Sequence, residues 1–179
     1  LTTRRQRQMC IRDRFKTAFV EKVSRMKNLA PSDPKSKQGA VVSKGHMEKV
    51  LSYIELAKEE GGQILCGGKR EVLPAPHNEG YFIQPTVIEG LKYDCRTNQE
   101  EIFGPVVTIM PFDTEEEVLM MANSTQYGLS ATIWTSNLKR AHRIADLVQA
   151  GIVWINSWLV RDLRTPFGLS LIHISEPTR

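Results

Sequence analysis

The chain has 179 residues, and its 24 Lys and Arg residues against 20 Asp and Glu residues give a formal net charge of +4. The length suits about one domain of the usual ~100–200 residues, and a hydrophobic content of 41% can supply its core. No apolar run approaches the ~20 residues that a membrane-spanning helix requires, so the composition excludes such a helix.

The two ends differ in character from the part between them. Five Arg residues and one Asp residue give segment 1–14 a charge of +4, whereas 169–179 and 15–168 each sum to zero. QMCIRDR (8–14) can be back-translated into DNA whose reverse complement encodes LSLIHI (169–174), as expected of paired sequencing adapters. We therefore interpret 1–14 and 169–179 as adapter-like, non-native segments; the alternative is a basic targeting arm and a C-terminal tail.

Without segment 1–14 the basic character disappears. No basic stripe, zinc-finger spacing or stacking motif remains in 15–168, so we expect no nucleic-acid partner. Cys66 and Cys95 form no CxxC pair, and no secretory signal is evident. These features favour a reducing, cytoplasmic location and no membrane partner.

The first half of 15–168 contains two predicted helices. Phe15, Phe19, Val23 and Met26 are three or four residues apart, which indicates one face of an amphipathic helix. The Pro-containing segment 28–39 predicts a loop. After Ser43, a second helix has apolar residues on one side, and Gly61 and Gly62 end it. The apolar side of this second helix consists of Met47, Val50, Leu51, Ile54 and Ala57. After it, we expect a short strand at 63–66, an exposed loop at 71–80 and an extended chain at 81–90.

The second half alternates strands and helices. Strands are predicted at 106–112, 129–135 and 152–156. Asp113 or Thr114 can cap the helix between the first two strands, and Asn137 the helix between the last two. This order predicts an α/β fold with a largely parallel sheet and packed helices, and ligands of such sheets bind beyond the carboxyl ends of strands. Segment 156–168 follows the last strand, so we expect a site there.

A self-contained active site is not evident. Cys66 or Cys95 could act as a nucleophile with His46, His77 or His142 as base, but almost any sequence supplies such a pair. We expect Cys66 to be a small buried apolar group of a strand. No metal-ligand spacing and no GxSxG motif occurs in the sequence.

QEEIFGPVVTI (99–109) is a better candidate. A Glu carboxylate can accept two hydrogen bonds from a vicinal diol such as a ribose, and an aromatic residue two positions later lies on the same side of an extended chain. Glu101 and Phe103 have this spacing. The alternative is a charged turn before a strand.

This segment and four others resemble motifs of the aldehyde dehydrogenase superfamily. The order and spacing of GYFIQPTV, EEIFGPV, YGLSATIWT, GIVWIN and TPFG are similar to the family's over essentially Phe15 to Gly168. The resemblance implies most of a catalytic domain from a larger, homo-oligomeric enzyme. It also implies NAD(P)-dependent oxidation of a small aldehyde to an acid: a Cys thiolate attacks the aldehyde, hydride passes to the nicotinamide, and a Glu-activated water releases the thioester.

The resemblance also assigns cofactor residues. It implies that Glu101 holds the nicotinamide-side ribose, that Phe103 packs near the nicotinamide ring, and that Gly104 and Pro105 shape the turn. It places His46 and Lys49 near the adenosine ribose. The cofactor expected is NAD, with NADP as the alternative.

NSWLVRDLRTPFG (156–168) resembles the loop of 2-hydroxymuconate and 2-aminomuconate semialdehyde dehydrogenases, whose substrates carry a carboxylate. A guanidinium can hold a carboxylate bidentately, so we expect Arg161 to be the clamp. Arg164 is the second candidate, or it supports the loop by pairing with Asp162; alternatively, both are surface arginines. Trp158 is expected to line the aldehyde tunnel, unless it is a core or interface residue.

The resemblance places the nucleophilic Cys and the general-base Glu upstream of Phe15. We therefore expect a fragment of a semialdehyde dehydrogenase that is inactive by itself. The alternatives are a dehydrogenase of the betaine-aldehyde or succinate-semialdehyde type, or a non-catalytic binding module.

Overall fold

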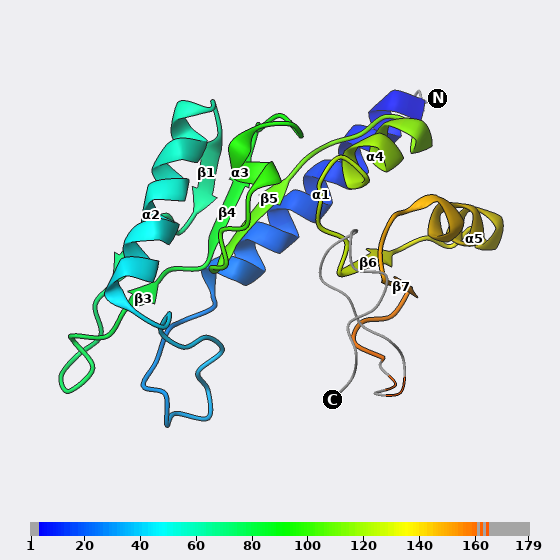
Figure 1. Ribbon diagram of the computed structural model, residues 1–179. Helices are drawn as coiled ribbons and strands as arrows, with labels where there is room; N and C mark the ends of the chain where they lie inside the picture. The colour runs from blue at the N-terminus through cyan, green and yellow to red at the C-terminus, as the bar shows by residue number, and fades with distance from the viewer. Residues whose placement is uncertain (1–3, 161, 163, 165–179) are drawn as a thin grey trace. The chain divides into compact units, whose positions relative to one another are not determined.

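The protein is described by a computed structural model covering residues 4–160, 162 and 164. The chain divides into two compact units, 1–111 and 112–179, and each is described by itself (Figure 1). The described part is mixed α/β, with parallel strands and several helices.

Unit 1 is built on a three-stranded sheet with the order β1-β4-β5. β1 (Gln63–Cys66) pairs antiparallel with β4 (Thr86–Glu89), and β4 pairs parallel with β5 (Val106–Ile109). A second small sheet pairs β2 (Arg70–Glu71) antiparallel with β3 (Phe82–Ile83). The helices of unit 1 are α1 (Arg4–Ser24), α2 (Lys44–Glu59) and α3 (Arg96–Gln99).

α2 forms as its sequence pattern predicts. The Ser43 hydroxyl accepts a hydrogen bond from the backbone N–H of His46 and caps the first turn. Gly61, just beyond the helix, has a φ of +91°, a conformation that costs glycine little. The side chains of Met47, Val50, Ile54 and Ala57 are buried, as expected, and Leu51 is half-buried.

α1 and α2 cover opposite faces of this sheet (Figure 1). Successive side chains of a strand point to opposite faces. In β4, Ile88 packs against Ala57 of α2, whereas the next residue, Glu89, accepts a hydrogen bond from Lys16 Nζ of α1 at 3.1 Å. α2 and the sheet together therefore form the apolar support for the segment between α3 and β5.

Unit 2 contains α4 (Glu115–Ala122), β6 (Ser130–Ile133), α5 (Leu138–Leu147) and β7 (Ile152–Ile155). β6 and β7 pair in parallel through the α5 crossover. Thr114 caps α4 and Asn137 caps α5, each accepting a hydrogen bond from a backbone N–H three residues later. Of the two caps proposed for α4, the structure therefore has Thr114.

Two features of the fold differ from the sequence-based expectation. The first helix begins at Arg4, eleven residues before Phe15, because the chain continues in helical conformation. The parallel pair β4–β5, connected through the short α3, was not predicted, since α3 has only four residues.

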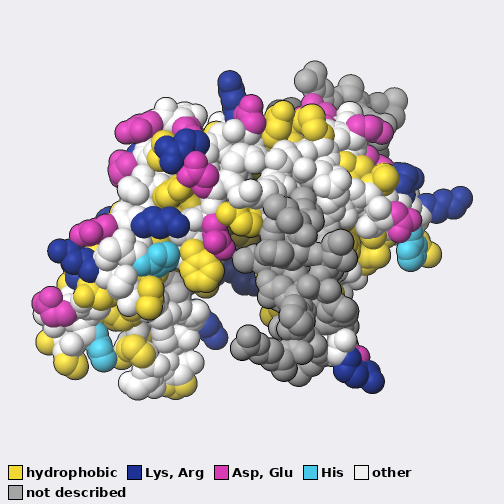
Figure 2. All heavy atoms as spheres, in the orientation of Figure 1, with side chains coloured by type: hydrophobic (Ala, Val, Ile, Leu, Met, Phe, Trp, Pro, Cys, Tyr) yellow, Lys and Arg dark blue, Asp and Glu magenta, His cyan; other side chains and the backbone are white. Residues whose placement is uncertain are grey.

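Large apolar side chains remain at the surface of both units, and Figure 2 shows hydrophobic groups among charged ones on one face. The exposed residues include Phe15 at 58%, Trp134 at 68% and Leu138 at 69% of their full accessibility. In the described part of unit 2, only Ala141 and Trp154 are buried hydrophobic residues. None of the described helices is long and apolar enough to cross a membrane.

Candidate functional site

Segment 100–104 runs along one side of α2. Tyr53, Lys49 and His46 occupy successive turns of the helix, because residues three or four apart share a face. The Lys49 ammonium donates a hydrogen bond to the carbonyl oxygen of Glu101 at 2.9 Å, and His46 Nε2 lies 2.7 Å from the carbonyl oxygen of Phe103. A carbonyl oxygen only accepts, so Nε2 carries the proton in this contact. The helix thus holds the backbone of the segment at two points.

Gly104 allows the close approach between this segment and α2. A Cβ atom at Gly104 would lie 2.7 Å from Cγ2 and 2.8 Å from Cγ1 of Val50, which is fully buried. Such distances are shorter than van der Waals contact. The glycine of the sequence motif is therefore required here by the packing of α2.

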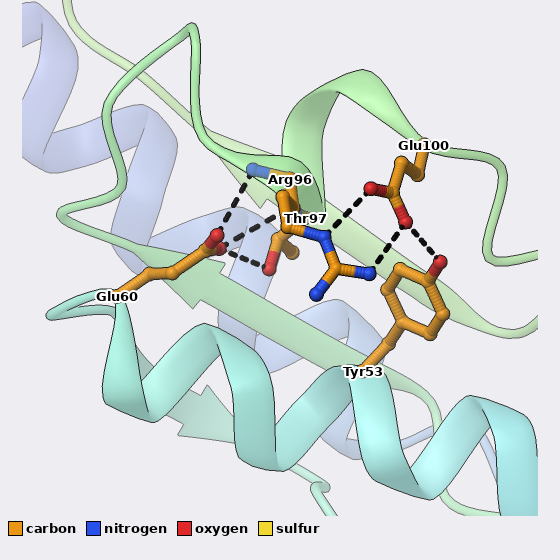
Figure 3. Close-up of polar contacts among 5 residues, drawn as sticks. All are labelled: Tyr53, Glu60, Arg96, Thr97 and Glu100. Carbon is orange, nitrogen blue, oxygen red and sulfur yellow. Dashed lines mark hydrogen bonds and ion pairs between the residues drawn. The ribbon is translucent and has the colours of Figure 1, made fainter.

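The two adjacent carboxylates of the motif have different surroundings, and Figure 3 shows those of Glu100. Glu100 accepts hydrogen bonds from Arg96 Nε at 2.7 Å, from Arg96 Nη2 at 3.0 Å, and from the hydroxyl of Tyr53. The hydrogen bonds from Arg96 and Tyr53 lower the pKa of Glu100 to about 2. The Glu101 side chain is exposed, and its carboxylate has no hydrogen-bond partner in the part of the chain that the structure describes.

Glu60, at the end of α2, fixes the start of α3 (Figure 3). Its carboxylate accepts hydrogen bonds from the backbone N–H of Arg96 at 2.9 Å and from the Thr97 hydroxyl at 2.6 Å. Burial alone would raise the pKa of Glu60, but the hydrogen bonds from Thr97, Cys95 and Arg96 outweigh it, so the pKa lies below its ordinary value. Both helices are thereby joined directly before the motif.

Phe103 has an unusual backbone and an exposed ring. Its φ is +56°, in the left-handed region that disfavours bulky residues, and its side chain is 74% exposed. The ring meets His46 edge-on, with 6.1 Å between the ring centres. Strained backbone persists only where surrounding contacts maintain it, and such residues cluster at active and ligand-binding sites.

The structure brings the four predicted cofactor residues together. Glu101 and Phe103 point outward from the segment, and His46 and Lys49 contact its backbone. The predicted roles of these four residues toward a cofactor stay predictions. Sequence reasoning missed Tyr53, Arg96 and Glu60; the i, i+4 spacing of Arg96 and Glu100 was the one available signal.

The loop after β7 lies in unit 2. The side-chain amide of Asn156 accepts from the backbone N–H of Thr135 at 2.9 Å and donates to its carbonyl at 2.8 Å. The buried Trp154 donates its indole N–H to the carbonyl oxygen of Val160 at 2.7 Å and packs edge-on against Trp158, with ring centres 5.1 Å apart. The loop is therefore closed across residues 154–160.

The predicted substrate residues are only partly described. Trp158 is 60% exposed beside Trp154. Arg164 pairs with Asp162, Nη2 to Oδ2 at 2.6 Å, and this hydrogen bonding lowers the pKa of Asp162. Of the alternatives for Arg164, the pairing with Asp162 is thus present. Arg161 lies outside the described residues, and its expected role as a clamp stays a prediction.

The two described cysteines have the character of structural residues. Cys66 ends β1 and is half-buried, in keeping with its expected place on a strand. Cys95 precedes α3, and burial, together with the nearby Glu60 carboxylate, raises the pKa of its thiol. A raised pKa disfavours the thiolate that a nucleophile requires. No cluster of His, Cys, Asp or Glu side chains suited to a metal ion occurs among the described residues.

Comparisons with known proteins agree with this fold. The profile of the aldehyde dehydrogenase family matches residues 2–168. The 2-aminomuconic semialdehyde dehydrogenase of Danio rerio is 51% identical over 156 residues, which cover 86% of this chain and 32% of the relative. The 2-hydroxymuconic semialdehyde dehydrogenase of Pseudomonas sp. (strain CF600) is 48% identical over 157 residues, covering 84% and 32%.

Among solved structures, the NAD+ complex of an aldehyde dehydrogenase from Bacillus cereus superposes with a TM-score of 0.81 at 39% identity, covering 89% of this chain and 32% of that one. The described α/β fold is thus shared with a solved aldehyde dehydrogenase. The chain belongs to the aldehyde dehydrogenase family. It spans about a third of the length of the curated relatives it matches.

Proposed function

We propose that this chain is part of an NAD-dependent dehydrogenase that oxidises a carboxylated semialdehyde, of the 2-hydroxymuconic or 2-aminomuconic type, to the acid. The observation that carries the proposal is the seating of segment 100–104 on α2, which leaves the Glu101 carboxylate and the Phe103 ring exposed. The names of the two muconic relatives support the substrate class.

The exposed groups suit a dinucleotide. The Glu101 carboxylate, which has no hydrogen-bond partner among the described residues, would accept hydrogen bonds from the two hydroxyls of a ribose, and the Phe103 ring would pack on a flat heterocycle. When bound, NAD supplies the acceptor for hydride. His46 and Lys49 would keep the backbone at Glu101 and Phe103 in place.

The cofactor part is tested by titrating NAD into the full-length dehydrogenase that contains residues 15–168. Glu101→Gln keeps the size of the side chain but removes its charge, so we expect the Kd for NAD to rise by about tenfold, as for a charge-assisted hydrogen bond. An unchanged Kd would contradict the role of Glu101.

The substrate part is tested at Arg161. A guanidinium that holds a substrate carboxylate contributes about 1.5–3 kcal/mol. Arg161→Ala should therefore raise KM for 2-hydroxymuconic semialdehyde by about 10- to 100-fold, while KM for an uncharged aldehyde of similar length stays the same. Equal effects on both aldehydes would argue against a carboxylate clamp and for an uncharged substrate.

We further propose that segments 1–14 and 169–179 are not native and that the 179-residue chain does not oxidise aldehydes by itself. Half-burial of Cys66 and the raised pKa of Cys95 support the second statement. Sequencing the source DNA outward from the codons of Phe15 and Gly168 tests the first. Reduction of NAD by the purified 179-residue chain, measured as absorbance of the reduced nicotinamide, would disprove the statement that the chain is inactive by itself.

A further inference from the structure

We propose that Tyr53, Arg96 and Glu100 are positioning residues that turn the Glu101 carboxylate outward toward the nicotinamide-side ribose. The inference rests on the proposed cofactor role of Glu101. The contacts of these three residues would explain why, of the two adjacent glutamates, Glu101 faces outward and Glu100 does not.

The backbone at Glu100 is extended, with a φ of −105° and a ψ of 148°. Consecutive side chains of an extended chain point to opposite sides. When the Glu100 side chain is held against α2 and α3, the side chain of Glu101 must therefore face away from them.

The Glu100 carboxylate is held by residues of both α2 and α3. Arg96 binds this carboxylate with two hydrogen bonds, at 2.7 and 3.0 Å, and the Tyr53 hydroxyl donates a third (Figure 3). The hydrogen bond to Glu100 raises the pKa of Tyr53, and Glu100 has a pKa of about 2, so donor and acceptor keep their protonation states throughout the neutral range. Tyr53 belongs to α2 and Arg96 to α3, and Glu60 joins these helices.

A rotation of the chain about its axis that exchanged Glu100 and Glu101 would also move Ile102, which lies on the same side of the chain as Glu100 and packs against the apolar cluster around Val50 and Ile54 of α2. The contacts of Glu100 therefore act together with the packing of Ile102. The hydrogen bond from Lys49 to the Glu101 carbonyl fixes the position of the backbone, whereas the Glu100 contacts and the packing of Ile102 fix its rotation.

The test compares binding of two probes to the full-length enzyme by calorimetry: NAD, and ADP, which lacks the nicotinamide half. Glu100→Gln should raise the Kd for NAD by about fivefold and leave the Kd for ADP the same within about twofold. Tyr53→Phe, which removes a single hydroxyl, should raise the Kd for NAD by a smaller factor. Glu55→Gln is the matched control, since Glu55 is an exposed carboxylate of α2 paired with Lys58 at 2.7 Å; it should change neither Kd.

Equal weakening of NAD and ADP would mean that Glu100 only supports the fold, and no change in either would mean that it positions nothing; both outcomes overturn the inference. If Glu100→Gln does not fold, the NAD-to-ADP comparison in Tyr53→Phe decides. Glu101→Gln separates the two proposals. If it leaves NAD binding unchanged, the proposed function fails, whereas a loss with Glu101→Gln but not with Glu100→Gln refutes the positioning role alone.

Discussion

Val50 of α2 lies directly against Gly104, at a distance that leaves no room for a side chain between them. The contact joins a helix residue predicted to be buried with a motif residue predicted to shape a turn. It sets how closely the segment that carries Glu101 and Phe103 approaches the helix.

Gly104→Ala should therefore lower the free energy of unfolding by about 1–3 kcal/mol, the usual cost of overpacking. The double variant Val50→Ala with Gly104→Ala should lose less unfolding free energy than the sum of the losses in the two single variants, because the smaller side chain at position 50 makes room for the methyl group added at position 104. Chemical denaturation of the four proteins measures this coupling. Additive effects would show that the two residues do not compete for the same space.

Phe103→Gly should raise the free energy of unfolding by up to about 1 kcal/mol while weakening NAD binding. Left-handed backbone costs a non-glycine residue ~1–2 kcal/mol, part of which the greater freedom of glycine in the unfolded chain offsets. Phe103→Ala is the control, because it removes the ring and retains Cβ. If the two variants are equally stable, the backbone at Phe103 is not strained.

Acid should remove the contribution of the Glu100 carboxylate to the free energy of unfolding. Its pKa falls from 4.5 to about 2 because Arg96 and Tyr53 bind the carboxylate, so the folded protein favours the charged form. The stabilisation is complete above about pH 4.5 and is lost as the pH falls toward about 2. The difference in unfolding free energy between the parent protein and Glu100→Gln should thus shrink over this range; a constant difference would mean that the ion pair contributes nothing.

Trp154→Phe should loosen the loop after β7. The change removes the indole N–H that bonds the Val160 carbonyl, which contributes about 0.5–1.5 kcal/mol, and disturbs the edge-on pair with Trp158. Near-ultraviolet circular dichroism should lose the signal of the paired indoles, and the amides of 156–160 should exchange faster. Trp134→Phe, at an exposed tryptophan, is the control and should leave loop exchange unchanged.

Asn156 should tolerate glycine poorly, although its φ of +49° suits glycine. Its amide makes two hydrogen bonds to the backbone of Thr135, and glycine removes both. We expect Asn156→Gly to lose about 1–3 kcal/mol of stability by thermal unfolding. Asn156→Asp, which keeps the acceptor but not the donor, should lose less; a glycine variant as stable as the parent would refute the role of the amide.

Local features of the sequence were enough to predict local structure. The i, i+3 and i+4 spacing predicted the buried face of α2, and the side chain of Asn137 predicted the start of α5, because both signals depend on residues within one or two turns. The motif residues from Glu101 to Gly104 were singled out by the family resemblance of their segment. The order of elements indicated parallel strands, which the β6–β7 pair confirms.

The tertiary structure decided which of two adjacent glutamates faces inward. Tyr53 and Glu100 are 47 residues apart, and Lys49 and Glu101 are 52 apart, so no local pattern links them. It likewise decided that β4 pairs in parallel with β5 and that β5 and β6 belong to different units. Such choices depend on how closely packed helices and strands approach one another, which side-chain periodicity does not encode.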